Sequence, residues 1–238
     1  MRLKIIAILT GVLILGAGTA GIIARTGYKD FNKEENALDR FLVAIMYDEL
    51  IDRELYYYEN GDEESGRKAL SEAGAVLAVS CEETSVFRYR SLIQKVSVKK
   101  VFKGEGIAEG EKIYLTNRDA GIYYNDKENA SEALVGIFDA NISFASEMIP
   151  GKTYLVFLER EVETETDQEI WLYHYGFMAL RFCYEEIENH VCTPIFDSYH
   201  GAFYGDIKEN EFFLESEESI QKMAVLKEKL LRQYPLDD

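Results

Sequence analysis

The stretch KVSVKKVFKGEGIAEGEKIYLT, residues 95–116, restricts the fold more than any other part of the sequence. Its valines and lysines alternate, and a glycine-rich loop then separates them from a second apolar run, IYLT. Alternation at a period of two predicts a β-strand with one buried and one solvated face. The glycine spacing differs from the GxGxxG nucleotide fingerprint, and the loop leads into a strand instead of a helix. We therefore predict strand, turn and strand, and no phosphate site.

Other segments also predict short β-strands bounded by turns. The strand over residues 87–102 loses its alternation at Lys100, which indicates a β-bulge or a strand end. Residues 75–79 form an apolar run that suits a strand buried on both faces. Residues 149–161 and 170–186 are two apolar, aromatic runs separated by a polar connection, which predicts a hairpin. Short strands separated by turns are typical of a small barrel or sandwich, so we predict a mainly β fold.

Helices are predicted on both sides of the strands. Residues 29–58 place apolar side chains on one helix face, and residues 216–235 show the start and stop signals of a helix. The second segment begins with Ser216 and two glutamates, carries basic side chains toward its end and stops at Pro235. The apolar positions that share a face of the first segment are Leu38, Phe41, Leu42 and Ile45.

The N-terminal run IIAILTGVLILGAGTAGII, residues 5–23, has no charged side chain. At a rise of about 1.5 Å per residue a helix of this length spans roughly 28 Å, close to the hydrocarbon thickness of a bilayer. A cleavable signal peptide is the alternative, with Gly18-Thr19-Ala20 as its cleavage site. We predict an uncleaved single-pass anchor, with the bulk of the chain outside the cytoplasm, or a secreted protein if the segment is removed.

These signals divide the chain into four parts. Residues 1–28 are the anchor or signal segment, and residues 29–65 are a helical, membrane-proximal segment. Residues 66–215 are a β-barrel domain, and residues 216–238 are a helix that packs on the barrel.

The formal net charge of the chain is -17, and the N-terminal segment contributes only basic residues, so the remainder is more acidic still. A domain with this charge repels nucleic acid and anionic lipid head groups. We therefore expect no nucleic-acid partner. The simplest role of the charge is solubility.

The sequence has three cysteines, Cys81, Cys183 and Cys192. In an oxidising compartment, Cys183 and Cys192 can form a disulfide across a local hairpin and leave Cys81 in a buried strand. Three reduced, buried thiols are the alternative, and the sequence does not decide between the two.

Four aromatic side chains at alternate positions share one face of a predicted strand. They are Trp171, Tyr173, Tyr175 and Phe177. An exposed aromatic face would be a binding surface for a partner, whereas a buried one would be part of the core. We favour core packing and keep the binding surface as a hypothesis.

Metal and catalytic motifs are weak in this sequence. His190, Cys192 and Cys183 offer three ligand types, but the paired spacing of a structural zinc site is missing. Cys81 or Cys192 could act as a nucleophile with a histidine, but the flanking residues match no hydrolase signature. We predict no metal and no cofactor, and keep catalysis as an alternative.

Four motifs in chain order, AVLAVSCEE, KVFKGEG, GEKIYLT and PGKTYLVFL, resemble the OB-like barrel of netrin and tissue-inhibitor-of-metalloproteinases modules in an extracytoplasmic bacterial domain. The resemblance covers roughly residues 72–185 and implies a fold, not an activity. The inhibitors of that superfamily bind the protease metal through an N-terminal cysteine, which has no equivalent here.

The expected function is therefore a membrane-tethered extracytoplasmic module that binds a protein or cell-surface partner and is not catalytic. The membrane contact would be made by residues 5–23. The alternatives are an extracytoplasmic hydrolase that uses a cysteine or histidine, and a peptidase inhibitor by analogy of fold.

Overall fold

A computed structural model describes most of the chain after residue 35, where residues 36–238 form one compact unit. The predicted anchor, residues 5–23, lies outside the described part. Within the described part, no helix is both long enough and apolar enough to cross a membrane. The described residues are 36–64, 68–88, 91–116, 122–124, 133–135, 144–162, 170–174, 181–195 and 200–236.

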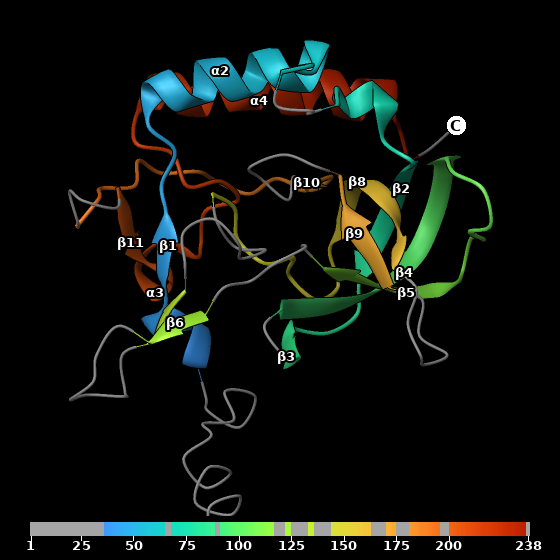
Figure 1. Ribbon diagram of the computed structural model, residues 1–238, viewed down its shortest axis with the longest axis horizontal. Coiled ribbons are helices and arrows are strands. Elements are labelled where there is room, and N and C mark those ends of the chain that lie inside the picture. The colour runs from blue at the N-terminus through green and yellow to red at the C-terminus, as the bar shows by residue number, and fades with distance from the viewer. Residues whose placement is uncertain are drawn as a thin grey trace, which may run out of the picture. The chain divides into compact units, whose positions relative to one another are not determined.

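The fold is mainly β and is built on a five-stranded closed barrel (Figure 1). Strands β2, β4 and β5 follow one another as antiparallel neighbours, and β5 pairs with β9 in parallel. Strand β8 pairs with both β9 and β2, which closes the barrel. The barrel strands are β2 (Ala75–Cys81), β4 (Ser91–Lys103), β5 (Lys112–Thr116), β8 (Thr153–Val162) and β9 (Ile170–Tyr173).

Shorter strands and helices surround the barrel. Two pairs of strands lie outside it, β1 (Leu42–Ala44) with β11 (Gly201–Phe203) and β6 (Ile122–Tyr124) with β7 (Ala133–Val135). Strand β3 (Val86–Arg88) pairs antiparallel with the start of β4, and β10 (Arg181–Cys183) pairs with β8. The described α-helices are α2 (Asp48–Asn60), α3 (Tyr204–Ile207) and α4 (Glu217–Gln233), and the short 3-10 helices are η2 (Ala37–Arg40) and η3 (Leu70–Glu72).

The predicted strand, turn and strand over residues 95–116 is confirmed. Strands β4 and β5 are antiparallel neighbours, and the loop between them contains three glycines with positive φ, Gly104, Gly106 and Gly110. The predicted bulge is also present, because Val98 pairs with Val79 while Lys100 pairs with the next residue back, Ala78. Lys99 is therefore the extra residue on β4.

The predicted hairpin is confirmed in part, since β8 and β9 pair as antiparallel neighbours. The predicted single strand over residues 170–186 is wrong, because β9 ends at Tyr173 and β10 begins at Arg181. Both pieces lie on the same edge of β8, since β2 occupies the other edge over residues 153–158.

The predicted helix over residues 29–58 is confirmed from Asp48 onward and is wrong for the described residues from 41 to 47. Residues 42–44 form strand β1, and the helix begins only at Asp48. Every side chain from Phe41 to Met46 is buried, whereas one face of a surface helix would be exposed. An apolar segment that is buried on all sides suits a strand between neighbouring segments. Here the backbone N–H of Phe144 donates a hydrogen bond to this segment, and the backbone carbonyl oxygen of Phe213 accepts one from it.

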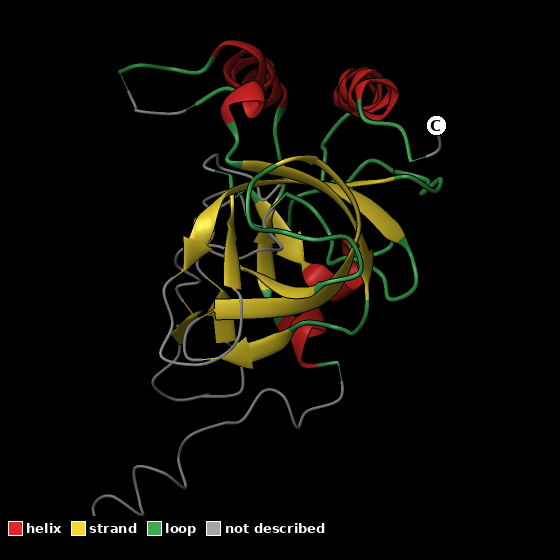
Figure 2. Cartoon of the chain, turned by 90° about the vertical axis from the view of Figure 1, so that its right-hand side faces the viewer, coloured by secondary structure: helices red, strands yellow, loops and turns green. Residues whose placement is uncertain are grey.

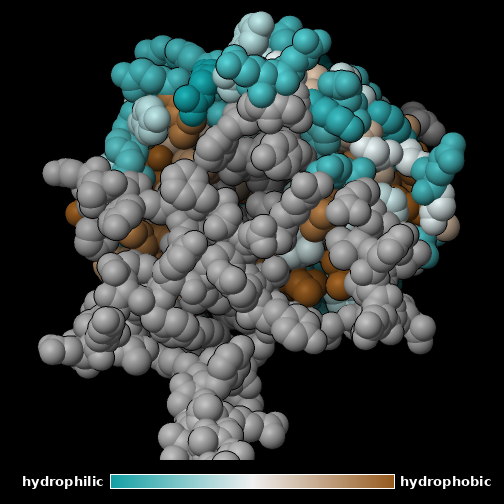
Figure 3. Space-filling view, viewed as in Figure 1, coloured by the Kyte–Doolittle hydropathy of each residue, from teal (hydrophilic) through white to brown (hydrophobic). Residues whose placement is uncertain are grey.

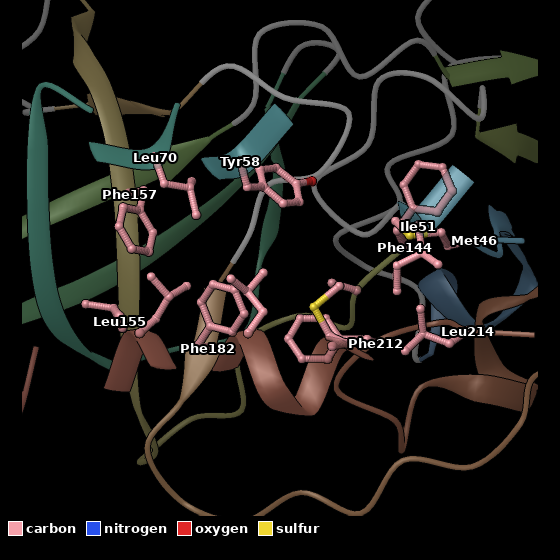
Figure 4. Packing of buried hydrophobic residues seen from close by; sticks show 14 of the residues in the cluster. Met46, Ile51, Tyr58, Leu70, Phe144, Leu155, Phe157, Phe182, Phe212 and Leu214 are labelled. Atoms are coloured by element: carbon pink, nitrogen blue, oxygen red, sulfur yellow. The ribbon is translucent and has the colours of Figure 1, made fainter. Parts of the chain in front are cut away.

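Two hydrophobic clusters hold the unit together. One fills the barrel with inward-facing side chains such as Leu77, Val96 and Ile113. The other lies between the outside of the barrel and the helices α2 and α4, which cover one side of it (Figures 1 and 2). Figure 4 shows this second cluster, where Phe157 of barrel strand β8 and Phe182 of the neighbouring strand β10 meet residues from the helical layer.

Candidate functional site

The most distinctive surface of the described chain is formed by α2 and α4, which run parallel along the outside of the barrel (Figure 1). The ammonium of Lys222 lies 2.6 Å from the Asp52 carboxylate, and one heptad further along each helix Lys229 pairs with Glu59. Both pairs join residues 170 positions apart, so the helices advance in the same direction. Hydrophilic side chains cover this layer on the face shown in Figure 3.

Local sequence explains why each helix forms where it does. In α2, Leu50, Ile51 and Tyr58 are buried at helical spacing, and the helix ends at Gly61, whose φ is positive. In α4, Met223, Leu226 and Leu230 form the buried stripe. Each helix thus buries one face against the second hydrophobic cluster and leaves the other in solvent.

The helix N-termini meet at a junction formed by Asp48, Glu215, Ser216 and Ser219. The Asp48 carboxylate accepts hydrogen bonds from the hydroxyls of Ser216, at 2.6 Å, and Ser219, at 2.5 Å. The backbone N–H of Asp48 in turn donates to the Glu215 carboxylate at 2.6 Å. The two serine hydroxyls lower the pKa of Asp48, because they stabilise its charged form. The junction therefore ties the start of α2 to the start of α4.

Toward the C-terminal ends of the same helices lies a pocket of about 140 Å³, here called the helix pocket. Its apolar lining comes from α2, η3, β8 and α4, four segments far apart in sequence. These apolar residues are Tyr58, Leu70, Phe157, Leu226, Leu230 and Tyr234. Figure 4 shows Tyr58, Leu70 and Phe157 beside one another in this cluster.

Polar side chains stand at the rim of the helix pocket. Glu59 and Lys229 form an ion pair there, and more than half of each side chain is exposed. Gln233 donates from Nε2 to the hydroxyl of Tyr234 at 3.1 Å. The carbonyl oxygen of Ser71 accepts a hydrogen bond from the ammonium of Lys103 at 2.9 Å. The pocket thus has an apolar floor and a rim whose charged groups already have partners.

A second group of polar residues is buried at the barrel and has a structural role. Gln94 donates to the carbonyl oxygen of Met148 at 2.8 Å and accepts from its N–H at 3.3 Å. The guanidinium of Arg181, which is 2% exposed, donates to the carbonyl oxygens of Ser146 and Ala145 at 2.6 and 3.0 Å. These bonds hold the chain before β8 against the barrel, where Met148 joins the interior cluster.

Glu147 lies within this buried group. Burial raises the pKa of its carboxyl group, while the hydrogen bond from Ser85 and the positive charge of Arg181 act in the opposite direction. One carboxyl oxygen of Glu147 is buried without a hydrogen-bond partner. The surroundings of Glu147 therefore favour the neutral form of its carboxyl group.

The predicted aromatic binding surface is not formed by its first two members. Trp171 and Tyr173 are 9% and 3% exposed and belong to the cluster inside the barrel. Core packing, which the sequence favoured, is therefore confirmed for these two residues. Tyr175 and Phe177 lie outside the described residues.

All three cysteines are buried and carry free thiols, so the disulfide considered for Cys183 and Cys192 is not formed. Burial raises the pKa of Cys81 and of Cys183 to about 12, and it also raises the pKa of Cys192. A thiol with a raised pKa is rarely ionised at neutral pH and is a poor nucleophile. The cysteines are better placed for packing than for reaction.

The three histidines lie in different environments. Nε2 of His174 lies 3.1 and 3.0 Å from the carbonyl oxygens of Lys68 and Ala69, so this nitrogen carries the proton. Nε2 of His200 lies 2.6 Å from the Glu215 carboxylate, next to the junction of the helices, and its ring meets Tyr47 edge-on. His190 is exposed. In the part of the chain that the structure describes, no group of three histidine, cysteine or carboxylate side chains could hold a metal ion.

The helix pocket was not anticipated from the sequence. Its residues are spread from Tyr58 to Tyr234, and they meet only because α2 and α4 are parallel over β8. The triple tyrosine at positions 56–58 is the one local signal that points to this region, since tyrosines are frequent in binding surfaces.

Known proteins offer no further guide to this site, since no protein-family model and no curated protein matches the sequence.

Proposed function

We propose that this chain is a membrane-tethered module that binds a protein partner outside the cytoplasm. Residues 5–23 would be the tether, and the unit from residue 36 onward would be the binding domain. The helix pocket carries the proposal, because an apolar hollow with a polar rim at the surface of a domain is a common form of binding site.

We infer further that the barrel is OB-like, in keeping with the resemblance to netrin and tissue-inhibitor-of-metalloproteinases modules. Numbered along the chain, its strands are neighbours in the order first, second, third, fifth and fourth, and the fourth pairs with the first. The third and fifth strands are parallel, and the other neighbours are antiparallel. This arrangement supports an OB-type barrel, which serves as a scaffold for many kinds of binding.

The chemistry of the described residues favours binding over catalysis. The thiols are buried with raised pKa values, and the buried Gln94 and Arg181 are occupied by backbone carbonyl groups. The helix pocket, by contrast, opens between two helices whose outer faces are in solvent.

The proposal can be tested in cells that produce the full-length chain with a photo-crosslinking amino acid. We expect a crosslinker in place of Gln233, at the pocket rim, to give a discrete protein adduct. The matched control is Val225, which is 57% exposed on the same helix but does not line the pocket.

The location of the domain has a separate test. In intact spheroplasts, we expect added protease to digest the domain.

Two results would contradict the proposal. A domain that is digested only after lysis would show that it faces the cytoplasm. Adducts of equal yield from positions 233 and 225, or from neither, would show that the helix pocket is not the binding site.

A further inference from the structure

We propose that the helix pocket binds a neutral aromatic side chain, of the size of a phenyl ring, presented by a polypeptide. This inference rests on the proposed binding function and names the group that the pocket recognises. Three observations carry it: the volume of the pocket, the apolar character of its buried lining and the position of its mouth.

The volume fits a single ring. The pocket measures about 140 Å³, and its floor consists of Leu70, Phe157, Leu226 and Leu230. An enclosed, wholly apolar cavity of about 150 Å³ is known to bind benzene, so a volume of this size accommodates one ring. The ring of Tyr234 forms a further wall and packs against Phe157 at a centroid distance of 5.9 Å. The site is thus large enough for one phenyl group and too small for a fused multi-ring ligand.

The buried lining indicates a neutral occupant. The lining residues that are buried carry no charge: Tyr58, Leu70, Phe157, Leu226 and Leu230. A charged group placed among them would lose its hydration without gaining a partner. The two charged residues of the lining, Glu59 and Lys229, form an ion pair at the exposed rim, and an apolar ring can occupy the floor without disturbing it.

The mouth of the pocket favours a side chain of a polypeptide over a free molecule. Its exposed lining residues include Glu59 of α2 and Lys229 of α4, so it opens between the two parallel helices. Such a setting, an apolar pocket inside a polar and partly aromatic rim, matches the places where aromatic anchors of partner proteins bind. A backbone that crosses the two helices could place its aromatic side chain between them.

The binding test uses residues 36–238. The described members of both hydrophobic clusters lie in this part, which forms one compact unit, so we expect it to fold on its own. The probe is N-acetyl-phenylalanine amide, and the matched control is N-acetyl-alanine amide, which has the same backbone and no ring. We expect the first to shift the NMR methyl signals of Leu70, Leu226 and Leu230, with a dissociation constant on the order of 1 mM. We expect no shifts from the second.

A variant of the pocket itself provides a second measurement. Ser71 is exposed and lines the pocket, so Ser71→Phe should fold and place its own ring in the site. We expect this variant to bind the probe at least tenfold more weakly. Val225→Phe adds the same ring to the outer face of α4 and should bind as the wild type does.

The contribution of the rim charges has its own test. The double variant Glu59→Gln, Lys229→Met removes the rim charges, and we expect its affinity for the phenylalanine probe to change less than threefold. A loss of threefold or more would show that the charges contribute to binding and would overturn the inference. Binding of free toluene without binding of the phenylalanine probe would overturn the choice of a polypeptide.

Failure of this inference differs from failure of the proposed function. A crosslinked partner at position 233, together with no binding of the phenylalanine probe, would leave the binding module in place and reject the aromatic ligand. Absence of both would reject the two together.

Discussion

Gly104 and Gly106 belong to one turn but are constrained in different ways. Both have positive φ, 132° and 78°, a region that strains any residue with a Cβ. A Cβ added at Gly104 would lie 2.9 Å from the Cβ of Ala75, whereas one added at Gly106 would meet no atom within 4 Å. Gly104 is therefore limited by both backbone conformation and packing, and Gly106 by conformation alone.

We expect Gly104→Ala to destabilise the protein more than Gly106→Ala. The strained backbone should cost about 1–2 kcal/mol in each variant, and the contact with Ala75 should add at least about 1 kcal/mol to the first. Urea unfolding of residues 36–238 measures both values, with Gly110→Ala as a second open position. Equal losses for the two variants would mean that β2 moves away from the added methyl group at no cost.

At this scale the sequence predicted the turn but not the difference between its glycines. Glycine-rich loops between strands are recognisable because few other residues adopt positive φ. The constraint on Gly104 comes from Ala75, which belongs to another strand and is brought close by pairing. No local pattern carries such information.

Among the elements, α2 and α4 depend on each other at the junction of their N-termini. Ser216 caps α4 by accepting the N–H of Ser219, and its hydroxyl also donates to Asp48 at the start of α2. Loss of this one side chain therefore affects both helices.

We expect Ser216→Ala to lower the free energy of unfolding by about 1–2 kcal/mol, because it removes a cap and a hydrogen bond to a carboxylate. Ser216→Thr, which keeps the hydroxyl, should restore most of this loss. A double-mutant cycle with Asp48→Asn should give a coupling of at least about 0.5 kcal/mol. The control is Ser71→Ala, at an exposed position away from the junction. If Ser216→Ala and Ser71→Ala have the same effect, the junction does not stabilise the helices.

Element boundaries were predictable where the chain itself carries stop and start signals. Helix α4 spans Glu217–Gln233, and the sequence placed a helix over residues 216–235 from a capping serine and a terminal proline. The start of α2 was missed because the run from Phe41 to Met46 is apolar throughout and suits a strand as well as a helix. The break between β9 and β10 was missed for a similar reason, since the aromatic run continues across it.

For the whole molecule, the buried carboxyl of Glu147 predicts a contribution to pH-dependent stability. Burial raises its pKa in the folded state above the ordinary value, so the folded state binds this proton more tightly than the unfolded chain. Between the unfolded and the folded pKa, its contribution therefore falls as pH rises. Above the folded pKa the carboxylate stays charged in a buried site, and the loss is complete.

We expect Glu147→Gln to reduce the decrease in stability as pH rises above about 4.5, because the variant has no carboxyl proton to lose. Arg181 keeps its bonds to the carbonyl oxygens of Ser146 and Ala145 in this variant. Glu109→Gln removes the same charge from an exposed position and controls for the net charge of the chain. Identical pH profiles for the wild type and Glu147→Gln would show that this carboxyl is solvated in the folded state.

The architecture as a whole was predictable only in its class. Alternating apolar positions and turn signals indicated a β-barrel, and the closed five-stranded barrel agrees with that. Two features depend on contacts between segments that are distant in the sequence. They are the parallel pairing of β5 with β9 and the hydrogen bond from Gln94 to the carbonyl oxygen of Met148. The helix pocket depends on both the barrel and the helical layer, so it could not be recognised before the fold was known.

The parallel direction of α2 and α4 has an electrostatic consequence. A helix carries about half a positive charge at its N-terminus and half a negative charge at its C-terminus, so parallel neighbours place like poles together and repel. Asp48 and Glu215 bring negative charge to the two positive poles. At the other ends, the last turn of α2 has no basic residue, and that of α4 has Arg232, which pairs with Glu228. The compensation for this repulsion, which two antiparallel helices would not experience, is therefore concentrated at the junction of the N-termini.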